Sequence, residues 1–161
     1  MTETDLSLYA VGTLTDEEAR NAAAWRYGGE YAVYNFPDWA ECAARGWSIT
    51  DAAKRENAYF SVRYAGEFLG FFHIMDRAGH VELGVGIKPE LCGQGHGYVL
   101  MALALETICQ TRGHTPVQLS VRTFNTRAVR CYERAGFTIT GTRYEDLGTA
   151  PGEMYIMQAA V

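Results

Sequence analysis

The chain has 161 residues, of which 48% are apolar and 20% charged, proportions that are ordinary for one globular domain. Its formal net charge of -5 argues against a large nucleic-acid-binding surface, which would need a basic patch. No apolar run reaches the roughly 18 residues of a membrane helix, and the N-terminus lacks the basic and apolar regions of a secretory signal. We therefore expect a cytoplasmic protein with neither nucleic acid nor membrane among its partners.

Potential metal ligands are scattered along the chain. The four cysteines form no C-x-x-C pair, and the four histidines show no H-E-x-x-H spacing. We therefore expect no metal site. Free thiols are the default for cysteines in a reducing compartment.

The N-terminal part of the chain predicts a strand and a helix. We expect a short strand around residues 6–11. Thr15 and Glu18 have the spacing of a capping box, in which each side chain bonds to a backbone N–H group at the start of a helix. This helix is expected to run to about residue 27 and to stop at Gly28 and Gly29.

Aromatic side chains are concentrated in residues 25–47. One explanation is local packing. The other is a substrate-binding mouth, because aromatic rings offer apolar walls and cation–π faces. On the second explanation Trp25, Tyr31 and Tyr34 are candidate substrate-binding residues. Three acidic residues of the same segment would suit a positively charged substrate: Glu30, Asp38 and Glu41.

The middle of the chain predicts short helices followed by strands. We expect helical segments at residues 38–46 and 51–56, and strands at residues 58–64, 67–75 and 80–87. Short turns join the three strands, so these strands should form an antiparallel meander.

The strand at residues 80–87 has two glycines on one face. Glu82, Gly84 and Gly86 alternate with apolar residues, so they lie on the same side of the strand. Glycines weaken strand packing, and they often mark a bulge or the close approach of a ligand.

A glycine-rich turn follows this strand and leads into a long apolar run. Pro89 precedes Gly93, Gly95 and Gly97, and residues 98–105 have the pattern of a buried helix. The first turn of a helix leaves N–H groups unpaired and carries partial positive charge, and glycines let an anion approach those groups. The alternative is that the glycines only make a tight connection. Their spacing excludes the G-x-G-x-x-G dinucleotide fingerprint and the G-K-S/T ending of a P-loop.

The C-terminal part predicts a return to the sheet. Gly113 should end the long helix. A strand at residues 117–121 should be parallel to the strand at 80–87, because a helix connects them. The remaining expected elements are a helix at 125–134, strands at 137–142 and 152–159, and a polar loop at 143–151.

Two segments together have the spacing of a known family. Residues 89–97, PELCGQGHG, take the positions of P-x-x-R-G-x-G-I-G. The pattern V-x-x-x-N-x-x-A-x-x-x-Y-x-x-x-G-F is matched by Val121, Asn125, Ala128, Tyr132, Gly136 and Phe137. From the residues alone, Asn125 is most simply a helix cap and Tyr132 a partly buried core residue. In this order and at this separation, the two segments make residues 58–143 resemble the GNAT superfamily of N-acetyltransferases.

The resemblance implies a fold class. This is α/β, with the acyl-CoA N-acyltransferase (GNAT) fold in one domain over residues 1–161. The sheet should be mixed and mostly antiparallel, with two splayed central parallel strands and flanking helices. Acetyl-CoA would lie between the splayed strands, in a cofactor-binding core at about residues 80–137.

The resemblance also implies the cofactor contacts. The pantetheine arm would pair with the backbone around residues 85–87, and the pyrophosphate would rest on the N–H groups of residues 93–98. Asn125 would bond the arm, and Tyr132 would face the sulfur as general acid. The cofactor-binding residues expected on this basis are Val85, Gly86, Ile87, Cys92, Gly93, Gln94, Gly95, His96, Gly97, Tyr98, Asn125, Ala128 and Tyr132.

Three positions bear on phosphate binding and the acceptor. Cys92 stands where the family has Arg or Gln, and a thiol brings no positive charge, so we expect backbone amides and the helix dipole to hold the anion. Glu82 lies about where many members place a base; its alternative is a solvated strand residue. Ser120 stands where some members that acetylate protein N-termini have Glu, which weakens that acceptor class. The candidate substrate-binding residues are Trp25, Tyr31, Tyr34, Glu82 and Ser120.

The combined prediction is an enzyme, an N-acetyltransferase that moves the acetyl group of acetyl-CoA to a primary amine of an unidentified acceptor by direct attack. Tyr132 and Glu82 are its expected catalytic residues. The alternative is a catalytically silent acyl-CoA-binding module. Folds of this kind commonly dimerise, so a homodimer is a further open prediction.

Overall fold

The computed structural model describes residues 5–145 and 151–160, which form a seven-stranded sheet in the order β1-β2-β3-β4-β5-β7-β6. The strands are β1 (Tyr9–Thr13), β2 (Tyr59–Tyr64), β3 (Glu67–Arg77), β4 (His80–Ile87), β5 (Pro116–Arg122), β6 (Thr138–Glu145) and β7 (Gly152–Ala160). The α-helices are α1 (Asp16–Ala23), α2 (Trp39–Ala44), α3 (Ala52–Arg55), α4 (His96–Arg112) and α5 (Thr126–Arg134). Four 3₁₀ helices are also described: η1 (Leu6–Leu8), η2 (Gly29–Tyr34), η3 (Ser48–Thr50) and η4 (Pro89–Leu91).

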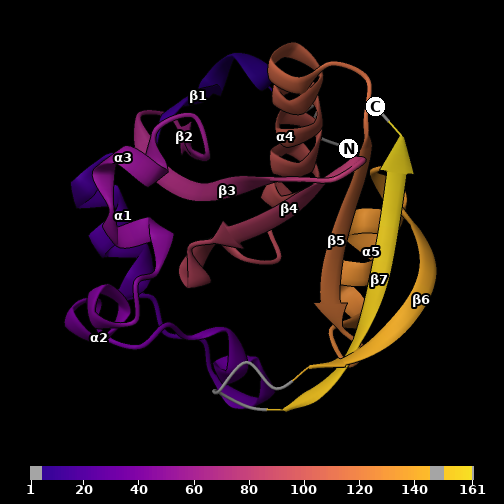
Figure 1. The fold of residues 1–161 in the computed structure, drawn as a ribbon. Helices are drawn as coiled ribbons and strands as arrows, with labels where there is room; N and C mark the ends of the chain where they lie inside the picture. Colours follow the sequence, from indigo (N-terminus) through magenta and orange to yellow (C-terminus); the bar gives the residue numbers. More distant parts are fainter. Residues whose placement is uncertain (1–4, 146–150, 161) are drawn as a thin grey trace.

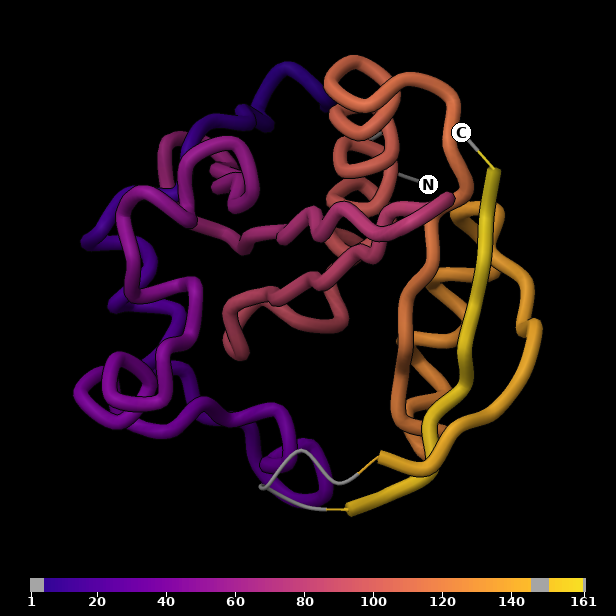
Figure 2. The backbone as a smooth tube through the Cα atoms, in the orientation of Figure 1, coloured from indigo at the N-terminus to yellow at the C-terminus, as the bar shows by residue number. Residues whose placement is uncertain are grey.

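The two central strands, β4 and β5, are parallel and pair over a short distance. Val81 pairs with Val117 and Glu82 with Gln118, and beyond these pairs the strands diverge (Figure 1, Figure 2). On its other side β4 stays paired with β3 as far as Ile87, and β5 stays paired with β7 along its length. The facing edges of β4 and β5 therefore open into a wedge, and the predicted pair of splayed parallel strands is confirmed.

Two apolar clusters hold the helices against the sheet. The larger cluster includes Phe72 of β3, Leu100 of α4 and Met157 of β7, each with at most 1% of its surface exposed. The smaller cluster joins α1 and η3 to β2 and β3, and it includes the buried side chains of Leu14 and Ile49. Helix α5 lies behind β5 and β7 in Figure 1, and residues of both α4 and α5 border the wedge.

Local sequence signals account for most of the element boundaries. The predicted capping box is present, with Thr15 accepting from the backbone of Glu18 at the start of α1. The prediction that α1 reaches residue 27 is wrong. The helix ends at Ala23, and the ring of Trp25 packs on Phe68 and Phe71, with centroid distances of 5.4 and 5.9 Å. Burial of this indole in the smaller cluster draws the chain away from the helix axis.

The two glycines on one face of β4 have different surroundings. A Cβ atom at Gly86 would lie 2.6 Å from the ring of Phe71, which real structures do not show. The ring of Phe71 thus occupies the space that a side chain at this position would need. At Gly84 a Cβ atom would have ordinary contacts with His73 and Met75, at 3.7 and 3.8 Å. Packing by Phe71 is therefore a sufficient reason for the glycine at position 86.

In the part of the chain that the structure describes, no helix has the combined length and apolar character needed to cross a membrane.

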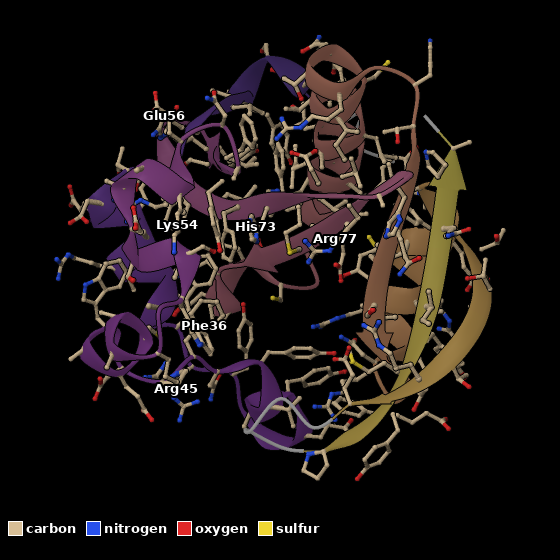
Figure 3. All side chains as sticks on the ribbon, viewed as in Figure 1. Phe36, Arg45, Lys54, Glu56, His73 and Arg77 are labelled. Atoms are coloured by element: carbon tan, nitrogen blue, oxygen red, sulfur yellow. The ribbon has the colours of Figure 1, made fainter. Side chains whose placement is uncertain are left out.

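His73 of β3 makes folding stability depend on pH. Its side chain is labelled in Figure 3. The ring stacks on Tyr59 at a centroid distance of 3.7 Å, and burial, with a smaller effect of Arg77, lowers its pKa from 6.5 to about 4. The unfolded chain then binds a proton on this residue before the folded chain does, so stability should fall as pH decreases from about 6.5 to about 4. We expect a loss of about 2–3 kcal/mol over this window.

Urea unfolding across this window tests the prediction against His73→Phe. The variant keeps an aromatic ring on Tyr59 and cannot titrate, while the carboxylates of the two proteins are the same. The wild type should lose stability relative to the variant as pH falls. Parallel stability curves for the two proteins would contradict the assignment.

Candidate active site

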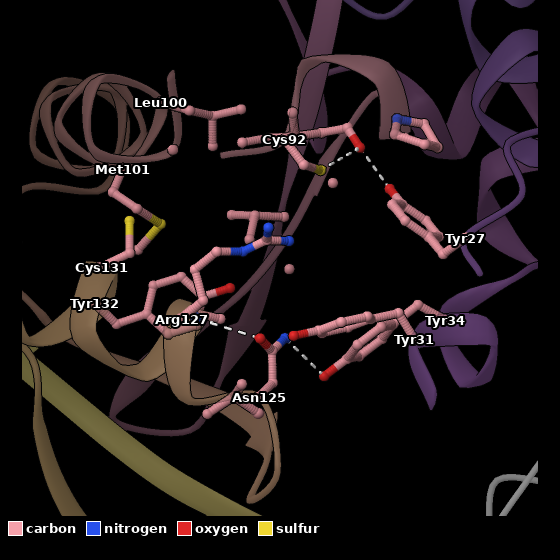
Figure 4. A pocket seen from close by; sticks show the side chains of 18 of the residues that line it. Tyr27, Tyr31, Tyr34, Cys92, Leu100, Met101, Asn125, Arg127, Cys131 and Tyr132 are labelled. Carbon is pink, nitrogen blue, oxygen red and sulfur yellow. Dashed lines mark hydrogen bonds between the residues drawn. The ribbon is translucent and has the colours of Figure 1, made fainter. Parts of the chain in front are cut away.

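The wedge between β4 and β5 contains a cavity of about 930 Å³ (Figure 4). Its walls come from β4, β5, the glycine-rich turn, α5 and the aromatic segment that ends at Phe36. The structure brings the following predicted site residues together around it: Trp25, Tyr31, Tyr34, Val85, Gly86, Ile87, Cys92, Gly93, Gly95, Gly97, Tyr98, Ser120, Asn125, Ala128 and Tyr132.

The glycine-rich turn presents backbone to the cavity. Gly93 and Gly95 have φ angles of 77° and 87°, a left-handed conformation that glycine adopts without a steric penalty. Gly95 is the N-cap residue of α4 and makes no side-chain cap, which leaves the first N–H groups of this 17-residue helix without side-chain partners.

Two predicted cofactor-binding residues of the turn do not line the cavity with their side chains. The side chain of Gln94 donates to the carbonyl of Glu90 at 3.0 Å. The buried ring of His96 is hydrogen-bonded to the hydroxyl of Tyr9 at 2.7 Å. Any contact from these residues to an anion therefore falls to their backbone N–H groups.

Cys92 is turned toward the end of β4. Its Sγ atom lies 3.8 Å from the carbonyl oxygen of Ile87 and 3.6 Å from that of Lys88, and it donates weakly to both. Burial raises the pKa of the Cys92 thiol, so the thiol stays protonated near neutral pH. These contacts give Cys92 a structural role at the strand end and offer no activated nucleophile.

Tyr27 closes one side of the cavity and was not among the predicted site residues. Its hydroxyl donates to the carbonyl of Ile87 at 2.5 Å, next to the contact from Cys92 (Figure 4). The last carbonyl of β4 is therefore already occupied by protein groups. A ligand that pairs with this strand end would compete with Tyr27 for this carbonyl.

Asn125 is the N-cap residue of α5. Its side-chain oxygen accepts from the backbone N–H of Ala128 at 3.3 Å, and its amide nitrogen donates to the hydroxyl of Tyr34 at 3.1 Å. The helix-cap reading of Asn125 from the sequence is confirmed. The bond to Tyr34 also ties the aromatic segment to the start of α5 (Figure 4).

Tyr132 lies on the cavity wall, in the second half of α5. Burial is the main cause that raises the pKa of its phenol above the ordinary value of 10.0. A phenol with a raised pKa keeps its proton at physiological pH, which is the state that a general acid needs.

Glu82 does not line the cavity. Its carboxylate pairs with the guanidinium of Arg77 at 3.0 Å, and about a quarter of its side chain (24%) is exposed. It precedes the point at which β4 leaves β5, which keeps it on the paired part of the sheet. This position argues against the predicted roles of Glu82 as base and as substrate contact.

The other candidate acceptor residues line the cavity but have protein partners. The Oγ atom of Ser120 accepts from Arg143 at 2.8 Å. The indole N–H of Trp25 donates to Asn21 at 2.8 Å, and only 8% of Trp25 is exposed, so its main role is in the core. Tyr31 lies edge-on to Phe124, with ring centroids 5.8 Å apart. The aromatic segment therefore packs locally and also forms one wall of the cavity.

The cavity is lined by cations. Arg26, Arg127, Arg130 and Arg134 contribute to its wall, and no carboxylate does so in residues 5–145 and 151–160. Glu30, Asp38 and Glu41 lie elsewhere; for example, Glu41 pairs with Arg45. The expectation that acidic residues of this segment surround a cationic substrate is therefore not supported.

The arginines of α5 were missed in the sequence. They lie next to the matched family positions, but the sequence gives no signal that their side chains face the cavity. Over the described residues, no cluster of three or more His, Cys, Asp or Glu side chains could hold a metal ion.

Comparison of the sequence with known proteins gives a family. The model of the acetyltransferase (GNAT) family matches residues 16–137. A mycothiol acetyltransferase of Streptomyces bingchenggensis is 32% identical over 124 residues, which are 74% of this chain and 38% of that protein. Another, from Salinispora tropica, is 35% identical over 105 residues, which are 56% of this chain and 34% of that protein. The chain thus spans less than half the length of these curated relatives.

Solved structures share the fold. A chimeric spermidine N-acetyltransferase from Vibrio cholerae superposes with a TM-score of 0.74 at 20% identity, over 94% of this chain and 95% of that one. A Salmonella typhimurium protein solved with acetyl-CoA has a TM-score of 0.65 at 16% identity, over 94% and 92%. At these identities the likeness shows the fold alone, and it confirms the predicted fold class. With a family model that covers most of its length, the chain belongs to the acetyltransferase (GNAT) family.

Proposed function

We propose that this protein transfers the acetyl group of acetyl-CoA to a primary amine. The single observation that carries this proposal is the place of Tyr132, a protonated phenol on the wall of the same cavity that the glycine-rich turn borders. A donor with its pyrophosphate at the turn and its arm between β4 and β5 would bring its thioester toward this phenol. Membership of the family supports acetyl-CoA as the donor.

The chemistry needs one proton donor from the protein. The amine nitrogen attacks the thioester carbon, forming the C–N bond, and the C–S bond then breaks with its electron pair on sulfur. Tyr132 donates its phenolic proton to the departing thiolate. The nitrogen loses a proton to water, and the phenolate regains one from water, so an amide and a free thiol result. Backbone N–H groups of β4 would polarise the carbonyl oxygen.

The pH dependence of the reaction should follow the acceptor. No carboxylate or histidine lines the cavity in the part of the chain that the structure describes, so the amine has to arrive neutral. The raised pKa of Tyr132 keeps the acid protonated. We expect kcat/KM to rise with pH up to the pKa of the acceptor amine, without a falling limb below about pH 10.

The pH dependence of kcat/KM, measured with two acceptors whose amine pKa values differ by about two units, distinguishes titration of the acceptor from titration of a protein base. The rising limb should move with the acceptor. A limb that stays at about pH 6–7 for both acceptors would show a protein base and contradict this account.

The charge of the cavity bears on the acceptor class. Four exposed arginines and no described carboxylate line it, and like charges repel. We propose an acceptor that carries no cation beyond the reacting amine. The likeness to the spermidine N-acetyltransferase concerns the fold and does not extend to its polyamine substrate. The relatives named mycothiol acetyltransferase are longer proteins, so mycothiol chemistry is one acceptor class for the test.

Thioester turnover across a panel of amines tests the function. The panel should include amino sugars, cysteinyl amines, amino acids, aromatic monoamines and spermidine. Turnover with at least one monoamine, above that with spermidine, is the expected result. Tight CoA binding with no turnover on any amine would contradict the enzyme and favour a silent acyl-CoA-binding module.

A further inference from the structure

The phosphate-binding turn of this chain lacks a cation of its own. Cys92 stands at the position where the family pattern has Arg or Gln, and its thiol is directed to the carbonyls of Ile87 and Lys88. The turn itself therefore offers an anion only backbone N–H groups. A donor that carries several phosphate charges would still gain from a nearby guanidinium.

Arg127 places a guanidinium against this turn from across the cavity. It is in the first turn of α5, and one of its terminal nitrogens lies 3.5 Å from the position of a Cβ atom at Gly93. Its positive charge also lowers the pKa of the Cys92 thiol, against the larger effect of burial, which raises this pKa. In Figure 4 the side chain reaches into the cavity between Cys92 and Asn125.

The surroundings leave this guanidinium available to a ligand. It lies 5.5 Å from the ring centroid of Tyr31, a contact that orients it without neutralising its charge. Within residues 5–145 and 151–160, no carboxylate is within ion-pair distance of Arg127. By contrast, the guanidinium of Arg134 lies 4.1 Å over the ring of Tyr98, farther along the same wall.

We propose that Arg127 is a phosphate-binding residue of the donor site and replaces, from α5, the cation that position 92 lacks. This inference rests on the proposed function only in that the donor is a CoA thioester. It adds a side-chain cation to the backbone amides and helix dipole that the sequence predicts as the main anion-binding groups. Because a guanidinium can donate two parallel hydrogen bonds to a phosphate, its removal should weaken CoA binding about 10- to 30-fold.

Calorimetric binding of CoA and of pantetheine, which lacks the phosphates, tests the proposal with the full chain. Arg127→Ala should raise the Kd for CoA about 10- to 30-fold and leave the Kd for pantetheine unchanged. It should also flatten the dependence of CoA affinity on salt concentration, because one fewer cation contacts the ligand. Arg45→Ala removes the same charge at the C-cap of α2, outside the cavity, and should leave the Kd for CoA unchanged.

Restoring the missing cation at its family position gives the sharpest test. In Cys92→Arg/Arg127→Ala the CoA affinity should return to within about 3-fold of wild type. Arg127→Lys, which keeps the charge but not the paired donors, should have an intermediate affinity.

Equal weakening of CoA and pantetheine in Arg127→Ala would overturn the proposal in favour of a structural role. An unchanged Kd for CoA with a raised KM for the amine would overturn it in favour of an acceptor contact. Since the readout is binding, a wild type that binds CoA but acetylates no amine contradicts the proposed enzyme while the role of Arg127 is still measured. A wild type that does not bind CoA overturns both.

Discussion

Tyr132→Phe should lower kcat about 100-fold and leave the Kd for CoA within about 2-fold of wild type. The variant keeps the ring, which lies edge-on to Phe137 at a centroid distance of 6.4 Å, and loses only the hydroxyl. That hydroxyl makes no hydrogen bond to another residue in the described part of the chain, so its removal leaves no protein group unpaired. The loss should therefore fall on protonation of the departing thiolate.

Single-turnover kinetics are the right measurement, because product release can hide the chemical step. Tyr144→Phe serves as the control. Tyr144 is on β6 with 71% of its surface exposed, and its hydroxyl is expected to have no part in turnover. If Tyr132→Phe keeps more than about a third of the wild-type rate, Tyr132 is not the acid.

The second large effect is expected at Gly95, the N-cap residue of α4. Its φ of 87° is strained for residues with a Cβ atom, and most of all for a β-branched one. Gly95→Val should force the turn out of this conformation and misalign the N–H groups at the start of α4. We expect the Kd for CoA to rise about 30-fold or more, together with a lower melting temperature.

Two further substitutions separate backbone strain from added bulk. Gly95→Asn tolerates a left-handed conformation and should lose much less affinity than Gly95→Val. Gly141→Val places the same side chain in β6, where a Cβ atom meets no atom within 4 Å, and should leave CoA binding unchanged. An affinity of Gly95→Val equal to that of wild type would show that the turn does not bind the donor.

Short-range patterns in the sequence were enough to predict most elements of the fold. The helix from Asn125 to Arg134 follows from a cap residue and the glycine at position 136, which lie within about three turns of each other. The strand at His80–Ile87 and its parallel partner follow from alternation and from the helix between them. These signals depend on residues that are close together in the sequence, so they can be recognised without the tertiary structure.

Motif spacing also predicted that the turn at residues 93–97 and the helix with Tyr132 lie together, and they border one cavity. The sequence by itself thus determined the order of the elements, the position of the wedge and most residues around it. It did not determine which charged groups face the wedge, since a side chain's partner is set by distant segments. Glu82 was a plausible base until its pairing with Arg77 was seen.

The tertiary structure decided the contacts between segments far apart in the chain. The hydroxyl of Tyr27 donates to the carbonyl of Ile87, 60 residues away, and so occupies the last carbonyl of β4. Arg127 reaches Gly93 only because α5 packs beside α4 across the diverging strands. Such contacts depend on how the sheet opens and how helices pack against it, which no local pattern encodes. The sequence predicted a phosphate-binding turn without a cation, and the fold brings the guanidinium of Arg127 beside this turn from another helix.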